Sequence, residues 1–263
     1  MSKDTQRTVS NLISNGDFSE GNAHWTRDFA PPKKADITDH LAASNNGSVA
    51  QTIKVDLSTQ YVANAQGKTL YDGTGSLQVV GNGPTRSVSV SKTTEWTDLV
   101  LPFTTAADTA SVTIKLVGNT GVVYFDNVVV SAVESDLELI KNGDFDDGAA
   151  SWTEYKDRVD SVVDLGTKQC KVANRGHADQ AVNVASGSTY LITFTGKANY
   201  SGQGNLQVLA QGQPTRSVSV SSSAATELSL LYRAETTEVT VSLFGSSGEI
   251  IFDNVSMKKV QAH

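Results

Sequence analysis

Asn15-Gly16-Asp17-Phe18, near the start of the chain, returns as Asn142-Gly143-Asp144-Phe145, 127 residues later. Further matches follow in the same order along the two halves: Trp25 with Trp152, Tyr61 with Tyr190, residues 73–79 with 202–208, residues 84–90 with 214–220, and residues 125–128 with 252–255. The offset drifts from 127 to 130 and then returns to 127. Compensating insertions in loops between fixed strands produce such a drift, so the chain consists of two homologous domains.

The repeat also sets the domain boundaries. We place a first domain at residues 11–135 and a second at residues 136–263, after a polar N-terminal tail at residues 1–10. Each domain is long enough to bury a hydrophobic core of its own.

Short runs rich in Val, Ile, Thr and aromatic residues recur in both domains and predict strands at residues 113–117, 122–130, 190–194 and 238–244. Gly, Asn and Ser bound these runs, and no stretch of helical length keeps a period of 3.6 residues. The sequence therefore predicts an all-β protein made of two tandem antiparallel β-sandwich domains.

Alternation along the strands separates an inner face from an outer one. Tyr61, Ala63 and Ala65 share one side of their strand, and the matching side in repeat 2 is also apolar, which marks it as the core. Gln78 lies between two inward-pointing apolar residues, and Gln207 takes the same position in repeat 2. Each domain is thus expected to have an outer sheet face of amides, hydroxyls and a lysine.

The composition excludes several classes of function. The chain has 28 acidic and 21 basic residues and a formal net charge of −7. This acidic balance argues against a nucleic-acid partner, which would require clustered Lys and Arg to meet phosphates. The apolar fraction is too low and too evenly spread for a membrane span. The single cysteine, Cys170, excludes an internal disulfide framework and a cysteine-rich metal site.

The order Asn-Leu-Ile-x-Asn-Gly-Asp-Phe, then a Gly and a Trp, then a central Gln strand, and a closing Phe-Asp-Asn-Val resembles a known family. It is similar to the family 4/9-type carbohydrate-binding modules of the galactose-binding-like jelly-roll group. The resemblance covers residues 11–133 and 139–260. It implies two antiparallel jelly rolls that bind glycan chains on a sheet face or at loop tips, and that do no chemistry of their own.

The resemblance further implies a structural calcium ion in each domain. In the family, a carboxylate after the opening motif and the Asp of the closing motif clamp the ion, and calcium prefers such oxygen ligands. The acidic residues that match are Asp17, Glu20 and Asp126 in repeat 1, and Asp144, Asp146 and Asp253 in repeat 2. Repeat 1 has Ser19 where repeat 2 has Asp146, so repeat 1 departs from the pattern. The alternative is that the closing Asp caps a turn.

Candidate sugar-binding residues are matched between the repeats, since aromatic rings and planar polar side chains hold sugars. These are Tyr71 with Tyr200, Gln78 with Gln207, and Arg86 with Arg216. A guanidinium can pair with a carboxylate or with vicinal hydroxyls. Each pair has a structural alternative: the tyrosines can pack at a core edge, the glutamines can be merely solvated, and the arginines can belong to one shared turn geometry.

The three tryptophans divide into two groups. Trp25 and Trp152 are matched between the repeats and are expected in the two cores. Trp96 has no aromatic counterpart in repeat 2, so it is either packing specific to repeat 1 or a lone platform for a ligand.

Signs of catalysis are missing from the sequence. The histidines have no counterparts between the repeats, as a duplicated Ser/His/Asp site would require: His24, His40, His177 and His263. The repeated acids, which could form a hydrolytic pair, are assigned to the calcium sites by the resemblance. No Gly-x-Ser-x-Gly, His-Glu-x-x-His or phosphate-binding loop occurs, so we expect no enzyme.

Three classes of function remain. The one we favour is a lectin-like protein that binds an oligo- or polysaccharide through two linked sites, which raises its affinity for a multivalent glycan. The second is a receptor-targeting module of a toxin, adhesin or phage system, and the third is a purely structural tandem. Residues 1–10 are polar and no apolar run of signal-peptide length follows them in this sequence; we expect action at an extracellular or cell-surface glycan. The sequence leaves the oligomeric state open.

Overall fold

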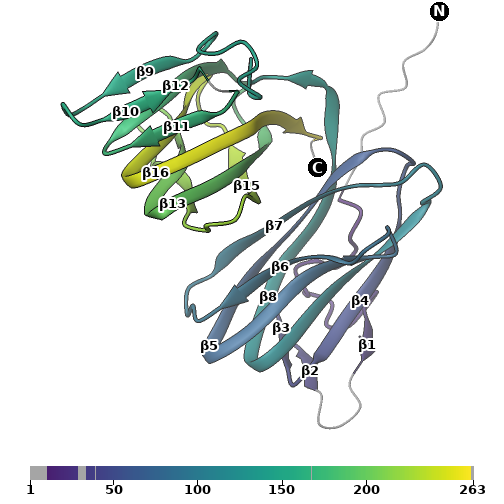
Figure 1. The fold of residues 1–263 in the computed structure, drawn as a ribbon. Helices are drawn as coiled ribbons and strands as arrows, with labels where there is room; N and C mark the ends of the chain where they lie inside the picture. The colour runs from purple at the N-terminus through teal and green to yellow at the C-terminus, as the bar shows by residue number, and fades with distance from the viewer. Residues whose placement is uncertain (1–10, 29–33, 39, 167, 262–263) are drawn as a thin grey trace, which may run out of the picture. The chain divides into compact units, whose positions relative to one another are not determined.

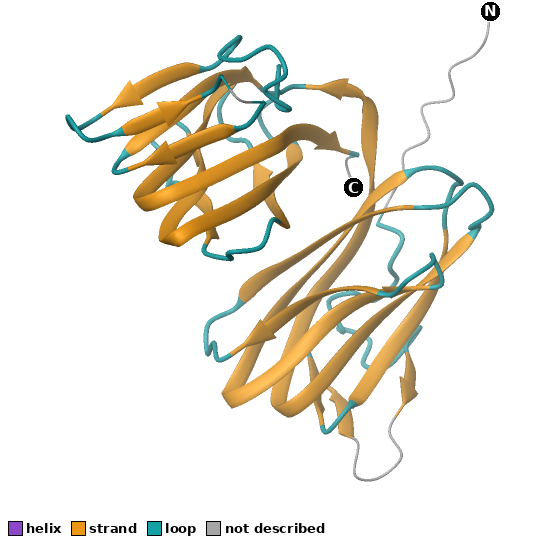
Figure 2. Ribbon diagram, in the orientation of Figure 1, coloured by secondary structure: helices purple, strands orange, loops and turns teal. Residues whose placement is uncertain are grey.

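The alternating segments of both repeats form long strands. The computed structural model describes residues 11–28, 34–38, 40–166 and 168–261, so the expected tail at residues 1–10 lies outside the described residues. Every regular element within these ranges is a strand, as Figure 2 shows, which confirms the predicted all-β class. The described part of the chain contains no helix long and apolar enough to cross a membrane.

The chain divides into two compact units. Unit 1 runs to Val133, and unit 2 runs from Glu134 to Val260. Gln261 belongs to unit 1, where its backbone N–H donates to the carbonyl of Ala132 at 2.9 Å. Each unit encloses its own cluster of buried apolar side chains.

Unit 1 is a sandwich of two antiparallel layers (Figure 1). Its first sheet follows the order β2 (Lys34–Ile37), β3 (Leu41–Ser44), the C-terminal half of β8 (Ser111–Glu138), the N-terminal half of β5 (Gln60–Val80) and β7 (Thr97–Thr104). Its second sheet follows the order β1 (Thr26–Asp28), β4 (Gly47–Lys54), the N-terminal half of β8, the C-terminal half of β5 and β6 (Arg86–Ser91). β5 and β8 pass together from one layer to the other where their register shifts, between Leu70 and Thr74.

Unit 2 repeats this order strand by strand. Its first sheet contains β10 (Val162–Asp164), β11 (Cys170–Ala173), the C-terminal half of β16 (Glu238–Val260), the N-terminal half of β13 (Thr189–Leu209) and β15 (Thr226–Arg233). Its second sheet contains β9 (Thr153–Lys156), β12 (Gly176–Asn183), the N-terminal half of β16, the C-terminal half of β13 and β14 (Arg216–Val220). The repeated sequence therefore encodes one sandwich topology twice.

The opening motif forms a loop that its first asparagine holds together. In unit 1 the side chain of Asn15 donates to the carbonyls of Gly21 and Ala23, both at 3.0 Å, and accepts from the N–H of Glu20 at 3.0 Å. Asn142 makes the same three bonds in unit 2. The indole N–H of Trp25 donates to the carbonyl of Asn15 at 2.9 Å.

Trp25 and Trp152 are 5% and 6% exposed, which confirms their expected place in the cores. Each ring lies 5.3 Å, between centroids, from the buried phenylalanine of its own opening motif, Phe18 or Phe145. The motif is thus structural in both units, and the tryptophan that follows it packs in the core.

The glycine of the opening motif brings that loop against the closing strand. The N–H of Val128 donates to the carbonyl of Gly16 at 2.8 Å, and Val255 does the same to Gly143. A Cβ atom on Gly16 would overlap the carbonyl oxygen of Val128, and one on Gly143 would overlap that of Val255. Only glycine allows this close approach of two backbones.

Replacing Gly16 by alanine is therefore expected to destabilise the protein. Because the overlap is with backbone, which yields less easily than a flexible side chain, Gly16→Ala should lower the free energy of unfolding by about 1–3 kcal/mol. Calorimetric melting measures the loss. The control is Gly166→Ala, whose added Cβ would meet nothing closer than 3.4 Å and should stay within about 0.5 kcal/mol of the parent. Equal melting of the two variants would contradict the proposed contact.

Candidate functional site

The matched arginines lie at the start of the edge strand of each second sheet. Arg86 is opposite Val79, an inward-facing residue, and its Nη1 donates to the carbonyl of Pro102 at 3.4 Å. Pro102 belongs to β7, so this guanidinium connects the edge strands of the two layers of unit 1. Arg216 is opposite Val208 in unit 2 and is exposed.

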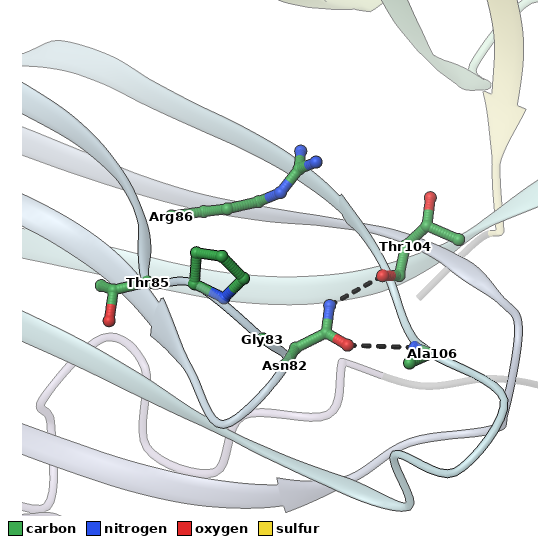
Figure 3. Close-up of a pocket in the computed structure, with 7 residues that line it drawn as sticks. Asn82, Gly83, Thr85, Arg86, Thr104 and Ala106 are labelled. Carbon is green, nitrogen blue, oxygen red and sulfur yellow. Dashed lines mark hydrogen bonds between the residues drawn. The ribbon is translucent and has the colours of Figure 1, made fainter.

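An open pocket of about 350 Å³ lies beside Arg86. Figure 3 shows that its floor is organised by Asn82, whose side chain donates to the carbonyl of Thr104 at 2.7 Å and accepts from the N–H of Ala106 at 3.0 Å. Asn82 therefore fixes the loop before β6 against the end of β7. The hydrogen bonds of Arg86 and Asn82 thus connect the two layers of unit 1.

The matched glutamines lie on the outer faces of the second sheets, as the alternation predicts. Gln78 donates to the Ser76 hydroxyl at 3.0 Å, and Gln207 donates to the Asn205 side chain at 3.0 Å. Since Arg86 lies on the other side of the same pair of strands, the structure does not bring Gln78 and Arg86 into one site.

Tyr71 and Tyr200 lie where β5 and β13 bend from one layer to the other. They are 90% and 94% exposed, and both adopt a left-handed backbone conformation, with φ of 56° and 52°. This conformation is uncommon for a residue other than glycine. Neither ring packs at the core edge, so both tyrosines are free surface rings.

A row of three aromatic rings crosses the outer face of the second sheet in unit 2; we call Tyr155, His177 and Phe244 the unit 2 aromatic row. His177 is opposite Tyr155 on one side and Phe244 on the other. The rings of Tyr155 and His177 are stacked, with centroids 4.8 Å apart and planes 14° apart, and the centroids of His177 and Phe244 are 6.2 Å apart. Tyr155 is 46% exposed, so the row presents aromatic surface to solvent.

Polar side chains occupy the next outward-facing position along these strands. Asp179 is opposite Ser242, which is opposite Gln207, and Asp179 Oδ2 lies 3.8 Å from His177 Nε2. Burial raises the pKa of Asp179, while the Ser242 hydroxyl and His177 act in the opposite direction. Asp179 Oδ1 and His177 Nδ1 are buried and make no hydrogen bond. Buried polar atoms are rarely left unpaired, and both atoms are covered in this conformation. The accessible part of these two residues is the remainder of each side chain, which is 19% exposed.

The same face of unit 1 differs in chemistry. The positions that correspond to the unit 2 aromatic row hold Asp28, Ser48 and Val117, and those that correspond to Asp179 and Ser242 hold Ala50 and Lys115. The two units therefore share a sheet but not the side chains on its outer face.

The acidic residues of unit 2 lie near one another at the opening loop. Asp144 accepts from the N–H of Asp146 at 3.3 Å, and Asp253 accepts from the N–H of Asn254 at 2.7 Å. Burial raises the pKa of Asp253, and the negative charges of Asp144 and Asp146 raise it further. Lys168 Nζ lies 3.1 Å from Asp146 Oδ1.

The acidic residues of unit 1 are engaged locally. Asp17 accepts from the N–H and the hydroxyl of Ser19, and these bonds lower its pKa. Glu20 lies 3.9 Å from His24, and the N–H of Asn127 donates to Asp126 at 2.7 Å. Across the described ranges of both units, no group of three or more His, Cys, Asp or Glu side chains is placed to hold a metal ion. A cation would therefore need backbone carbonyl oxygens as additional ligands.

Sequence reasoning missed the unit 2 aromatic row and Asp179. It looked for residues present in both repeats, and these positions differ between them. The available signal was alternation within residues 153–156 and 176–183, which places Tyr155, His177 and Asp179 on one side of two short strands.

Residues 137–244 match the model of a family described as carbohydrate binding domain, CBM_4_9. This confirms the resemblance to family 4/9-type modules over that stretch, which is less than half of the chain and contains the whole unit 2 aromatic row. No curated protein matches the chain.

Several solved structures are similar in fold. The tandem CBM22-1–CBM22-2 domain of Paenibacillus barcinonensis Xyn10C is 14% identical over 97% of this chain and 99% of its own, with a TM-score of 0.38. The CBM22-1–GH10 modules of Clostridium thermocellum xylanase 10B are 21% identical over 48% of this chain and 29% of theirs, with a TM-score of 0.35. TmCBM61 bound to β-1,4-galactotriose is 16% identical over 47% of this chain and 99% of its own, with a TM-score of 0.37. At these scores the likenesses add no argument about function.

Asp179→Asn is expected to stabilise the protein at neutral pH. Because the pKa of Asp179 is raised in the folded state from its ordinary value of 3.8, the folded protein holds this proton more tightly than the unfolded one. Stability is then lost as the pH rises through the folded pKa. Asparagine removes that loss, so its gain should be present at pH 7 and shrink toward pH 3, as thermal melts at several pH values would show. Exposed Asp108→Asn is the control, and a gain that does not depend on pH would contradict this account.

Proposed function

We propose that this protein is a non-catalytic, lectin-like carbohydrate-binding protein whose principal glycan site is the outer face of the second sheet in unit 2. The observation that supports this most directly is the unit 2 aromatic row, which presents the exposed ring of Tyr155 beside the partly exposed side chain of Asp179. The same residues lie within the stretch that matches the carbohydrate binding domain family.

The chemistry of this face suits a pyranose ring. The exposed ring of Tyr155 offers a flat apolar surface to the C–H face of a sugar. The partly exposed carboxylate of Asp179 can accept a hydrogen bond from a sugar hydroxyl, and the amide of Gln207 can both donate and accept. Recognition of a neutral sugar would then combine aromatic packing with hydrogen bonds to these polar side chains.

A binding role also fits the only thiol in the chain. Cys170 is fully buried in unit 2, and burial raises the pKa of its thiol, so it is unsuited to act as a nucleophile. The family matched by residues 137–244 is a binding domain rather than an enzyme family. A glycan ligand of this kind would place the action of the protein at an extracellular or cell-surface polysaccharide.

Replacing Tyr155 by alanine is expected to weaken glycan binding. Tyr155→Ala removes the exposed ring. The affinity for soluble β-glucan, xylan or galactan, measured by retention in affinity gels, should therefore fall by about tenfold. Asp28→Ala, at the matching position of unit 1, is the control and should bind as the parent does. If no polysaccharide retains the parent protein, the glycan proposal fails and the search moves to protein receptors.

We also propose a structural calcium ion at the opening loop of unit 2, where carboxylates from among Asp144, Asp146 and Asp253 would supply some of the ligands and backbone carbonyl oxygens the others. Support comes from Asp253, whose pKa is raised first by its burial and then by the negative charges of Asp144 and Asp146. Calcium binds carboxylate and carbonyl oxygens and would offset their mutual repulsion. Unit 1, with Asp17, Glu20 and Asp126 engaged locally and Ser19 at the position of Asp146, is a weaker calcium site.

Calcium is expected to raise the melting temperature, and a chelator to lower it. At a concentration of about 100 times Kd the stabilisation would be about 2.7 kcal/mol. Asp253→Asn gives a sharp test: it should destabilise the protein in calcium, where it removes a ligand, and stabilise it in chelator, where it removes a carboxylate of raised pKa. Asp126→Asn is the matched variant in unit 1. Stabilisation by Asp253→Asn under both conditions would contradict the calcium proposal.

A further inference from the structure

Unit 1 has an aromatic cluster of its own, but on the outer face of its first sheet. Lys68 of β5 is opposite Tyr124 of β8, which is opposite Ala42 of β3. Trp96 directly precedes β7, beside the strand that holds Lys68, and His40 directly precedes β3. We call Lys68, His40, Trp96 and Tyr124 the unit 1 cluster.

The cluster is built around the lysine. Lys68 Nζ lies 4.3 Å from the centroid of the Trp96 ring and 5.5 Å from that of Tyr124. The His40 ring meets both of these rings edge to face, with centroids 6.4 Å from Trp96 and 5.0 Å from Tyr124. Trp96 is 38% exposed, so part of its surface remains open to solvent.

The ammonium of Lys68 lies over two aromatic rings. Within the described part of the chain its ammonium makes no ion pair and no hydrogen bond; its recorded partners are the rings of Trp96 and Tyr124. An ammonium has three donors. Its attraction to a ring face is electrostatic, and a donor that is not directed at a ring can serve an incoming acceptor.

Unit 2 shows that the fold does not require this cluster. Lys197 occupies the position of Lys68, and it is opposite Ile251, which replaces Tyr124. Ala225 precedes β15 as Trp96 precedes β7, and Gln169 precedes β11 as His40 precedes β3. The lysine is thus present in both units, and the three rings surround it only in unit 1.

The reverse holds on the second sheet, where the aromatic row is present in unit 2 and replaced by Asp28, Ser48 and Val117 in unit 1. Each unit therefore has a surface aromatic cluster that includes a histidine. The cluster lies on the first sheet in unit 1 and on the second sheet in unit 2. Rings that the shared fold does not need, gathered at one place on a solvated face, indicate a ligand surface.

We propose that the unit 1 cluster is a second glycan-binding site, which packs the C–H face of a pyranose against Trp96 and donates from Lys68 to a sugar oxygen. This inference rests on the proposed function. The acceptor is the oxygen of a hydroxyl or of a uronate carboxylate. The two sites then differ in their hydrogen bonds: Asp179 in unit 2 accepts from sugar hydroxyls, whereas Lys68 in unit 1 donates to a sugar oxygen.

Tryptophan fluorescence tests the site directly, since Trp96 is 38% exposed while Trp25 and Trp152 are 5% and 6% exposed. The full chain is titrated with soluble xylan, galactan and β-glucan, and separately with polygalacturonate. Binding at the unit 1 cluster should change the emission and protect it from acrylamide quenching, and Trp96→Phe should abolish both effects. A response to polygalacturonate alone identifies a carboxylate acceptor, and a response to neutral polysaccharides identifies a hydroxyl.

A matched pair of lysine variants separates binding from folding. Lys68→Ala should weaken the affinity by about tenfold, whereas Lys197→Ala, the same residue without surrounding rings, should leave it unchanged. Thermal melts of Trp96→Ala and Lys68→Ala test whether each variant remains folded. Affinity gels with Tyr155→Ala report the unit 2 site in parallel.

The outcomes distinguish this inference from the proposed function. If Tyr155→Ala abolishes retention while Trp96→Ala and Lys68→Ala bind as the parent does, the unit 1 site is wrong and the unit 2 site stands. If retention depends on Trp96 and Lys68 but not on Tyr155, the unit 1 site stands and the unit 2 site is wrong. If no polysaccharide is retained and the emission never changes, both are wrong.

Discussion

The contact between the backbone of the opening motif and the backbone of the closing strand underlies each sandwich. Gly16 against Val128, and Gly143 against Val255, fix the first loop of a unit to its last long strand. The hydrogen bonds of the leading asparagine and of the tryptophan N–H then close the loop over the core. Because this approach excludes any Cβ, the motif returns in the second repeat with its glycine unchanged.

Residues that do not support this frame are free to differ. The inner faces of the two units are both apolar. On the outer faces, the aromatic rings lie on the first sheet in unit 1 and on the second sheet in unit 2. An outer face is solvated whatever its side chains, so the fold tolerates either arrangement. A duplicated binding domain can therefore acquire two sites of different chemistry without any change in topology.

The candidate site was only partly predictable for this reason. Gln78 and Gln207 lie on the expected outer face because strict alternation fixes the side of a strand. Arg86 is identical in both repeats, which marks it as a candidate, yet its place at a strand end directs it to Pro102, across the edge of the sandwich. His177 has no matching histidine in repeat 1, and comparison of the repeats therefore does not identify it, because a ligand surface need not be duplicated with the fold.

The sequence by itself determined the two repeats, their strands, the inward side of each strand and the buried tryptophans, because these follow from local alternation and from matches at a nearly constant offset. The tertiary structure alone decided which side chains meet across strands. Tyr155, His177 and Phe244 are far apart in the chain, and so are His40, Lys68, Trp96 and Tyr124. Only the antiparallel register brings each set together, since pairing between distant strands is set by the packing of the whole sandwich.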